Sequence, residues 1–360
     1  MTRRLLFLNG LAILTIPIHH ATAYGLQAMF YWADRYRPVT VPNFDLLGSP
    51  SYYISIIIRQ LDTYSVPGFL FISGFFVAFM ARGKNSKVTW KTIMPRVKVL
   101  IIPFVVWTVI RYVVLRRFPT SLDEILNPYH FIPLLIQFYL LAPFLVPLAK
   151  DRWQLLLGVA AFIHLSVQAI RYTNNIGVEF PGQDMLLVLI PRWIVIGQQP
   201  FWFPFGLVFG LHLKEFSQRL AQFKWQLLVA VVVFGVLSVV EYQVADFING
   251  EAWIGPSFSG FSRNFYILAF LLYVLSLDKI SPTMMKHFTA LGTKSLGIYL
   301  ANIPFIYVLA VLMYRLTPWV LGNQLLYQTA LFAIGLGGPL LLMRLVQRSP
   351  LRGSYRYLFG

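Results

Sequence analysis

The chain has 360 residues, of which 58% are hydrophobic and only 12% charged, with a formal net charge of +17 and no cysteine. Because a soluble domain carries about a quarter charged residues, this composition excludes a soluble enzyme, a nucleic-acid-binding domain and a disordered scaffold. The lack of cysteine excludes disulfides, thiolate metal sites and a cysteine nucleophile. Several uncharged runs of about 18 to 22 residues are long enough to cross a bilayer as helices. The sequence therefore predicts a multi-pass membrane protein.

Ten apolar stretches have the composition of membrane-spanning helices, so the predicted fold is all-α, a polytopic integral membrane helical bundle of about ten transmembrane helices. The bundle forms a single domain over residues 1–360. The sixth stretch contains Gly197-Gln198-Gln199-Pro200 and is predicted to be a broken helix or two short pieces. The eighth is short, and we expect it to extend through Asn264 and Asp278. In chain order the stretches cover residues 5–29, 60–81, 99–115, 129–149, 154–170, 186–213, 226–245, 265–277, 295–314 and 324–345.

The first stretch follows Arg3 and Arg4 and resembles a signal peptide in layout. It lacks a small-x-small cleavage site and contains His19 and His20, so we interpret it as a retained helix.

Basic residues are distributed unevenly around the apolar stretches. If the N-terminus is inside, every lysine lies in an inner segment, and the basic residues elsewhere are all arginines. Since positively charged segments stay in the cytoplasm, both termini are predicted to be cytoplasmic. We expect a multi-pass protein of the plasma (inner) membrane. Its longest outer loops, at about 34–59 and 246–263, are too short to hold an extramembrane domain.

Ionisable and amide side chains within a span are candidate functional residues, because lipid exposure of such groups is costly. Asn9 and His20 are eleven positions apart in the first stretch. That spacing puts them within about 20° of one helix face and about 16 Å apart along the axis. His20 is then either a catalytic base or a side chain that only hydrogen-bonds a neighbouring helix.

Other polar side chains also have two open interpretations. Arg59 and Asp62, one turn apart, either pair with each other or belong to a site. Arg192 either lines a cavity or extends to a membrane surface. Glu241 either orients a histidine or caps a helix. The remaining candidates, with the same choice between packing and function, are Ser73, Arg111, Gln137, Tyr139 and Asn302.

Arg96 and Lys98 stand at the start of the third stretch. They either mark topology and contact anionic lipid or form a docking patch for a phosphorylated cytosolic ligand. The sequence has no glycine-rich phosphate loop, no HExxH zinc motif and no GxSxG nucleophile motif.

Five segments in a fixed order carry a family resemblance. They are Leu8-Asn-Gly-Leu-Ala-Ile-Leu14 followed by His20, Val66-Pro-Gly-Phe-Leu-Phe-Ile-Ser-Gly-Phe-Phe76, Arg96-Val-Lys-Val-Leu-Ile-Ile-Pro-Phe-Val-Val-Trp107, Phe131-Ile-Pro-Leu-Leu-Ile-Gln-Phe-Tyr-Leu-Leu-Ala-Pro143 and Ser295-Leu-Gly-Ile-Tyr-Leu-Ala-Asn-Ile-Pro304. Together, over residues 5 to about 304, they resemble the membrane acyltransferases usually called acyltransferase 3. The chain keeps the first-helix histidine of that family as His20. It departs from the family pattern at Asn9 and Val99, where the family has arginines, and at Asn302, where it has a histidine.

The resemblance implies transfer of an acyl group, commonly acetyl, from cytosolic acyl-CoA to a hydroxyl of a glycan or small molecule at or beyond the membrane. It implies that His20 is a general base or transient acyl carrier and that Arg96 and Lys98 hold the CoA phosphates. Asn9 would donate a neutral hydrogen bond to the donor chain. The candidates for stabilising the oxyanion are Tyr139, Asn302 and Ser73, and those for binding the acceptor are Arg192, Arg59 and Glu241.

The partners expected from this interpretation are membrane lipids, acyl-CoA as a substrate and the acceptor, with no nucleic acid, metal or permanent cofactor. The oligomeric state stays open. The alternative function is a transporter or flippase derived from this fold that has lost acyl transfer. The substitutions at Asn9, Val99 and Asn302 and the interrupted sixth stretch favour that alternative. A purely structural scaffold would leave the intramembrane histidine and asparagine without a purpose.

Overall fold

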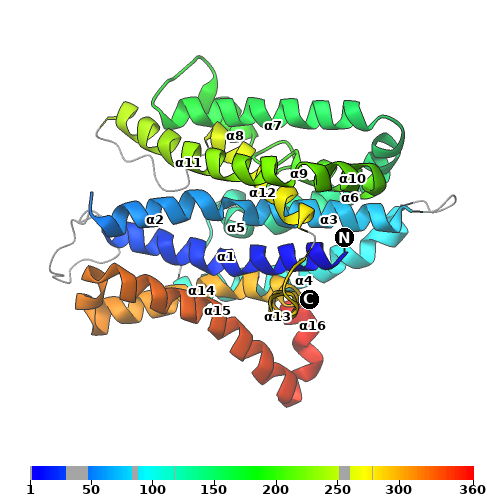
Figure 1. Ribbon diagram of the computed structural model, residues 1–360. Helices are drawn as coiled ribbons and strands as arrows, with labels where there is room; N and C mark the ends of the chain where they lie inside the picture. The colour runs from blue at the N-terminus through cyan, green and yellow to red at the C-terminus, as the bar shows by residue number, and fades with distance from the viewer. Residues whose placement is uncertain (1, 30–47, 83–87, 117, 251–259, 278) are drawn as a thin grey trace.

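The computed structural model describes residues 2–29, 48–82, 88–116, 118–250, 260–277 and 279–360. Helices make up 85% of it, and these described ranges contain no strand. The long helices run side by side, and both chain ends lie toward the same end of the bundle (Figure 1). The prediction of an all-α membrane bundle is confirmed. Several parts of the sequence predictions lie outside the described residues: Lys84 and Lys87 among the lysines of the inner segments, Asp278 at the end of the eighth stretch, most of the outer loop at 34–59, and residues 251–259 of the outer loop at 246–263.

Within the described ranges, eight helical segments are long and apolar enough to cross a membrane. They are α1 (Thr2–Ala28), α2 with α3 (Pro50–Leu61 and Ser65–Met80), α4 (Trp90–Leu115), α6 (Phe131–Asp151), α7 (Trp153–Asn175), α11 (Lys224–Ile248), α14 (Ser295–Leu316) and α15 (Gln324–Arg348). Two shorter apolar helices, α9 (Trp202–Leu211) and α12 (Phe261–Ser276), fall on the other two predicted stretches.

Several shorter elements join the spans. They are η2 (Asp62–Tyr64), α5 (Leu122–Leu126), η3 (Asn127–Tyr129), α8 (Gln183–Leu189), α10 (Leu213–Gln222), α13 (Pro282–Gly292), η4 (Pro318–Gly322), η5 (Pro350–Ser354) and α16 (Tyr355–Phe359). The sixth predicted stretch is indeed interrupted, because α8 and α9 are separated by the non-helical residues 190–201.

Two predicted boundaries differ from the structure for the same reason. The second span begins at Pro50 and the third at Trp90, about nine or ten residues before the predicted starts. Ser49 accepts a hydrogen bond from the Tyr52 N–H, and Thr89 forms a capping box at the start of α4. Side-chain caps satisfy the free N–H groups of a first helical turn, so each helix begins at its cap, well before the predicted apolar stretch.

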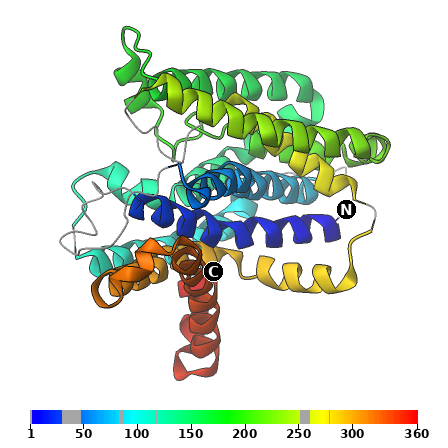
Figure 2. The ribbon, with the colours of Figure 1, turned by 60° about the vertical axis from the view of Figure 1, so that its left-hand side comes forward.

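The two halves of the second span and α1 occupy the centre of the bundle. Figures 1 and 2 show α1, α2 and α3 between a layer containing α7 and α11 and a layer containing α14 and α15. Accordingly, 67% of the most apolar window of the α2–α3 span is buried, against 17% of that of α11. The exposed valines of α11, among them Val232, Val236 and Val240, form a surface suited to lipid.

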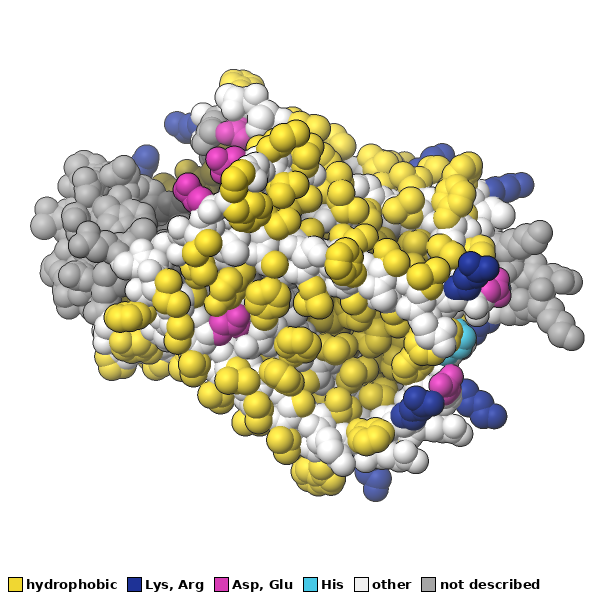
Figure 3. All heavy atoms as spheres, turned by 90° about the horizontal axis from the view of Figure 1, so that it is seen from above, with side chains coloured by type: hydrophobic (Ala, Val, Ile, Leu, Met, Phe, Trp, Pro, Cys, Tyr) yellow, Lys and Arg dark blue, Asp and Glu magenta, His cyan; other side chains and the backbone are white. Residues whose placement is uncertain are grey.

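The surface repeats the charge asymmetry of the sequence. Figure 3 shows hydrophobic side chains over much of one face, with lysines and arginines gathered mainly at the edge toward which both termini point in Figure 1. We call this end of the bundle the basic end. The positive-inside rule predicts that it faces the cytoplasm.

Helices α3 and α9 pack closely through glycines. A Cβ atom on Gly74 would overlap the Phe203 carbonyl, and one on Gly206 would overlap the Phe71 carbonyl. Small residues at such crossings allow membrane helices to approach at backbone distance. The packing role predicted for the Ser73-Gly74 pair is confirmed at Gly74.

We predict that Gly206→Ala lowers stability by about 1–3 kcal/mol, because the new methyl group would push α9 away from α3. Thermal unfolding of the purified protein in nanodiscs measures the effect. Gly337→Ala in α15 is the matched control, because a Cβ there meets no atom within 4 Å. Equal melting temperatures for the two variants would contradict the packing interpretation.

A candidate active site of two adjoining cavities

A cavity of about 340 Å³ lies among α1, the α2–α3 junction, η3, residues 190–201, α12 and α14. We call it the outer cavity, because it lies farther from the chain termini than the second cavity described below. Its polar lining is unusually rich in ionisable side chains for a membrane bundle. These polar and ionisable residues are His19, His20, Arg59, Asp62, Thr63, Ser65, Asn127, His130, Arg192, Gln198, Gln199, Arg263 and Tyr299.

Two histidines of α1 lie in the outer cavity in different settings. The Nδ1 atom of His19 lies 2.6 Å from Oδ1 of Asp62, and Arg59 donates a hydrogen bond of 2.6 Å to the His19 carbonyl. The His20 ring stands at 82° to the His19 ring, with centroids 5.7 Å apart. Among the described residues no hydrogen bond holds the His20 ring. His19 is therefore fixed, whereas His20 is available to a molecule in the cavity.

Residues 190–201 bring Arg192 and Gln198 into the cavity wall without a helical backbone. The Gln137 side chain donates to the Trp193 carbonyl at 2.6 Å and accepts from the Val195 N–H at 3.2 Å. Arg171 donates to the Ile190 carbonyl at 2.5 Å. Irregular backbone at membrane depth requires such internal partners. The mid-span glutamine noted in the sequence therefore holds this segment in place.

Glu241 fixes the start of α12. Its two carboxylate oxygens accept hydrogen bonds of 2.8 Å from the N–H groups of Phe261 and Ser262. A carboxylate at a helix N-terminus satisfies free N–H groups and the helix dipole. Of the two interpretations left open, the structure shows the cap. Glu241 does not line the outer cavity but positions the turn that carries Arg263.

A second cavity of about 190 Å³, the inner cavity, is lined by Asn9, Ser73, Ser295 and Tyr299 together with apolar side chains. Tyr299 is the described residue that lines both cavities. The Tyr139 side chain lies close enough to the side chains of Ser73 and Arg96 to interact with both. Arg96 is exposed at the start of α4, so this chain of contacts leads from the basic end to the inner cavity.

The three departures from the family pattern each have a structural setting. Asn9 donates a hydrogen bond of 2.8 Å to the Gly292 carbonyl at the end of α13. Val99 lies beside the C-terminal Gly360, where α16 packs on α4. Asn302 is fully buried and donates to the carbonyls of Ile298 and Tyr299 in its own helix, at 2.9 and 2.6 Å.

The structure brings five of the ten predicted site residues to the walls of the two cavities, and two more interact with a residue of the inner cavity or with each other. His20, Arg59 and Arg192 line the outer cavity. Asn9 and Ser73 line the inner cavity, and Tyr139 and Arg96 connect it to the basic end. The residues placed elsewhere are Lys98, which is exposed, and Asn302 and Glu241, which line neither cavity.

Sequence reasoning did not select Tyr299, His130 or Arg263 as site residues. Arg263 lies just before the eighth apolar stretch, and a charged residue is common at the end of a membrane span. Tyr299 belongs to the fifth family-like segment, which could have marked it as a site residue. A tyrosine in a span is also typical of the aromatic belt at the membrane interface.

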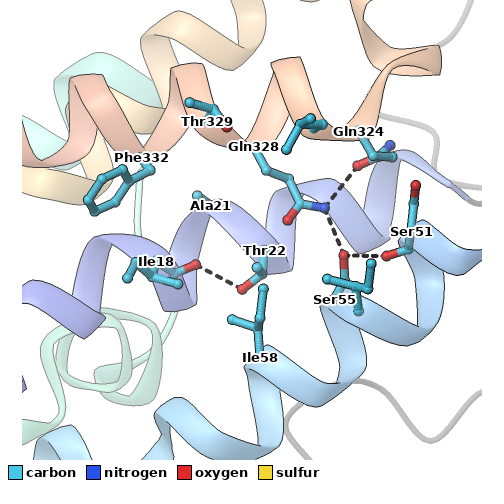
Figure 4. Close-up of a pocket in the computed structure, with 12 residues that line it drawn as sticks. Ile18, Ala21, Thr22, Ser51, Ser55, Ile58, Gln324, Gln328, Thr329 and Phe332 are labelled. Carbon is cyan, nitrogen blue, oxygen red and sulfur yellow. Dashed lines mark hydrogen bonds between the residues drawn. The ribbon is translucent and has the colours of Figure 1, made fainter.

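A separate groove of about 250 Å³ lies between α1, α2 and α15 (Figure 4). Gln328 donates there to Ser55 at 2.9 Å and to Gln324 at 3.1 Å. Ile18 and Thr22, which line the groove, each lie about 200° around α1 from His20, so the helix separates the groove from the outer cavity. The described residues that line the groove include no ionisable side chain and so offer no acid or base.

Comparison with known proteins gives one match. A family model described as an acyltransferase domain matches residues 5–344, nearly the whole chain. No curated protein and no solved structure shows significant similarity to the chain.

We predict that Gln137→Leu destabilises the protein, because it leaves the Trp193 carbonyl and the Val195 N–H without a partner. A buried group that loses its hydrogen bond costs about 1–3 kcal/mol. Thermal unfolding in nanodiscs measures the loss, with Gln226→Leu on the exposed face of α11 as control. An unchanged melting temperature for Gln137→Leu would show that these two bonds do not hold the segment.

Proposed function

The chain belongs to the acyltransferase 3 family, and we propose that it moves an acetyl group from cytoplasmic acetyl-CoA to a hydroxyl of a molecule bound in the outer cavity. That it is a multi-pass membrane acyltransferase follows from the family and from its apolar helices. The observation that carries the proposal is the position of Tyr299 in the walls of both cavities. A donor that enters from the basic end could thus present its acyl group to His20.

On the donor side, the proposal assigns the CoA phosphates to Arg96. A guanidinium group binds phosphate oxygens through two parallel hydrogen bonds, and Arg96 is exposed at the basic end. The acyl-pantetheine arm would then lie along Tyr139 and Ser73 and enter the inner cavity beside Asn9. Lys98 adds positive charge at the same end without contacting this route.

In the proposed transfer, His20 accepts the proton of the acceptor hydroxyl as its oxygen attacks the thioester carbonyl carbon. The C–S bond then breaks, the acetyl group stays on the acceptor oxygen as an ester, and CoA leaves as a thiolate. The protonated His20 then gives its proton to that thiolate, which yields free CoA and restores the neutral imidazole. An imidazole suits the role because its ordinary pKa lies near neutrality.

We assign stabilisation of the carbonyl oxygen to the Tyr299 hydroxyl. The reacting carbonyl must meet both the donor cavity and His20, and Tyr299 borders both cavities. Of the earlier candidates, Tyr139 and Ser73 lie toward the basic end, and the Asn302 amide donates within its own helix. One well-placed donor to an oxyanion contributes about 10²–10³-fold in rate.

We predict that acetyl-CoA raises the melting temperature of the protein in nanodiscs with increasing concentration, by mass action. The stabilisation should weaken with 3′-dephospho-acetyl-CoA and in Arg96→Ala. Arg348→Ala, which removes another exposed arginine of the basic end, is the control and should leave it unchanged. No shift at millimolar acetyl-CoA would contradict a CoA donor and favour the transporter alternative.

We predict that His20→Ala lowers acetyl transfer at least 100-fold, as expected for loss of a general base, while stabilisation by acetyl-CoA persists. Thiol release from acetyl-CoA, with methyl glucoside and methyl glucuronide as probe acceptors, measures the rate. Because the chain has no cysteine, a thiol reagent reports only free CoA. His287→Ala on the exposed face of α13 is the control. A His20→Ala rate equal to that of the unmodified protein would remove His20 from the mechanism.

A further inference from the structure

We propose that the outer cavity selects an anionic acceptor, a hydroxylated small molecule or sugar that carries a carboxylate or phosphate. This substrate class belongs to the same site as the proposed function. It rests on that function, because only acyl transfer makes the bound molecule an acceptor. The geometry that carries it is the convergence of Arg59, Arg192 and Arg263 on one cavity wall.

The three arginines come from separate parts of the chain. Arg59 lies in the last turn of α2, Arg192 in the non-helical segment 190–201, and Arg263 in the first turn of α12. The three guanidinium groups are close enough to act on one another electrostatically. Like charges gathered in a low-dielectric interior repel, so the arrangement is favourable only with negative charge among them.

The cavity wall itself supplies little negative charge. Asp62 is the one acidic residue in its described lining, and its Oδ1 atom already contacts His19 at 2.6 Å. The lining histidines supply no negative charge in either protonation state. The wall thus combines three arginines with one aspartate, and a bound anion would balance it.

Carboxylates behind the wall are committed to other partners. Glu241 accepts two backbone hydrogen bonds from the start of α12. Asp123 accepts hydrogen bonds from the Trp193 indole at 3.1 Å and from the Asn127 amide at 3.3 Å. Neither carboxylate lines the cavity. From behind the wall Glu241 acts electrostatically on Arg263 and Asp123 on Arg192, so each offsets part of the arginine charge without facing a bound molecule.

The type of basic residue in the cavity further limits the chemical class of the ligand. Every lysine in the sequence belongs to the predicted inner segments, whereas the cations of this cavity are all arginines. A planar guanidinium matches carboxylate and phosphate oxygens with paired donors, which an ammonium group does not. The amide side chains of Asn127, Gln198 and Gln199 line the same cavity and suit neutral hydroxyl groups.

The size of the cavity also limits the acceptor. Its volume of about 340 Å³ is at the lower end of the range of about 300–1,000 Å³ for small-molecule sites. This space suits one sugar unit, or the charged end of a larger molecule, at the position where His20 would act.

The test measures binding without donor, in nanodiscs of zwitterionic phosphatidylcholine. Methyl glucuronide, glucose 1-phosphate and neutral methyl glucoside are titrated at constant ionic strength while the melting temperature is recorded. We expect stabilisation by the two anionic probes and none by methyl glucoside at the same concentration. A further arm replaces part of the lipid with phosphatidylglycerol, whose headgroup carries both a phosphate and hydroxyls.

Arg192→Gln should weaken binding of the anionic probes about tenfold or more, because it removes a charged donor while keeping an amide. Arg315→Gln, an exposed arginine at the end of α14, is the control and should leave binding unchanged. Stabilisation by phosphatidylglycerol that Arg192→Gln weakens would place the anion on a lipid headgroup rather than on a soluble sugar. Equal stabilisation by methyl glucoside, or no dependence on Arg192 in any arm, would overturn the proposal.

The outcome is separable from that of the proposed function. Anion binding that depends on Arg192, in a protein that acetyl-CoA does not stabilise, would retain the anion site and reject the acyl donor. Stabilisation by acetyl-CoA without any response to the anionic probes would retain the donor site and reject the anionic acceptor.

Discussion

Backbone groups that leave the helical pattern inside a bilayer must find hydrogen-bond partners within the protein. The outer cavity exists because the chain meets this constraint where it leaves regular helix. Residues 190–201 depend on Gln137 and Arg171, and in α14 Pro304 cannot donate to the Leu300 carbonyl, which instead accepts from the Tyr129 hydroxyl at 3.0 Å. The junction η2 between α2 and α3 carries Asp62 to His19. Residues of the segment 190–201 and of η2 line the cavity, and Pro304 follows its lining residue Ile303, so polar contacts that stabilise the fold also shape the site.

Two of the residues that differ from the family pattern, Asn9 and Val99, make packing contacts within this architecture. Asn9 joins α1 to the end of α13, and Gly10 lies so close to Phe288 that a Cβ there would overlap its carbonyl. Val99 meets the C-terminal residue, and the Trp107 indole donates to the Leu358 carbonyl in the adjoining α16 at 2.8 Å. Two positions that carry arginine in the family therefore serve here as contacts for α13 and the C-terminal segment. Their substitution is not by itself evidence for lost chemistry.

Hydropathy was enough to predict the all-α bundle, because lipid exposure imposes long apolar runs, and the sequence Gly197-Gln198-Gln199-Pro200 predicted the interruption of the sixth span. Hydropathy could not place the starts of α2 and α4, where Ser49 and Thr89 cap helices that begin well before the predicted stretches. In the site, the rarity of charged groups within spans marked Arg59 and Arg192, and His20 was marked also by its spacing from Asn9 and by the family resemblance. The proximity of His19 to Asp62 was hidden, since sequence spacing suggests the nearby Arg59 and says nothing of a contact across 43 positions. Arg263 was missed because only tertiary packing turns a flanking charge inward.

The wall that the two cavities share also affects how the proposed transfer would depend on the membrane potential. Moving one elementary charge through a membrane potential of 100 mV requires about 2.3 kcal/mol. In the proposed transfer the acetyl group moves outward without its bonding electrons, which stay on the CoA sulfur, while the proton taken by His20 moves inward to that sulfur. The two charges cancel, so the transfer would be independent of the membrane voltage. The phosphates of CoA would remain with Arg96, and an anionic acceptor would remain among the arginines on the far side. The partition would let an acetyl group cross the membrane while the anionic groups of donor and acceptor stay in their own compartments.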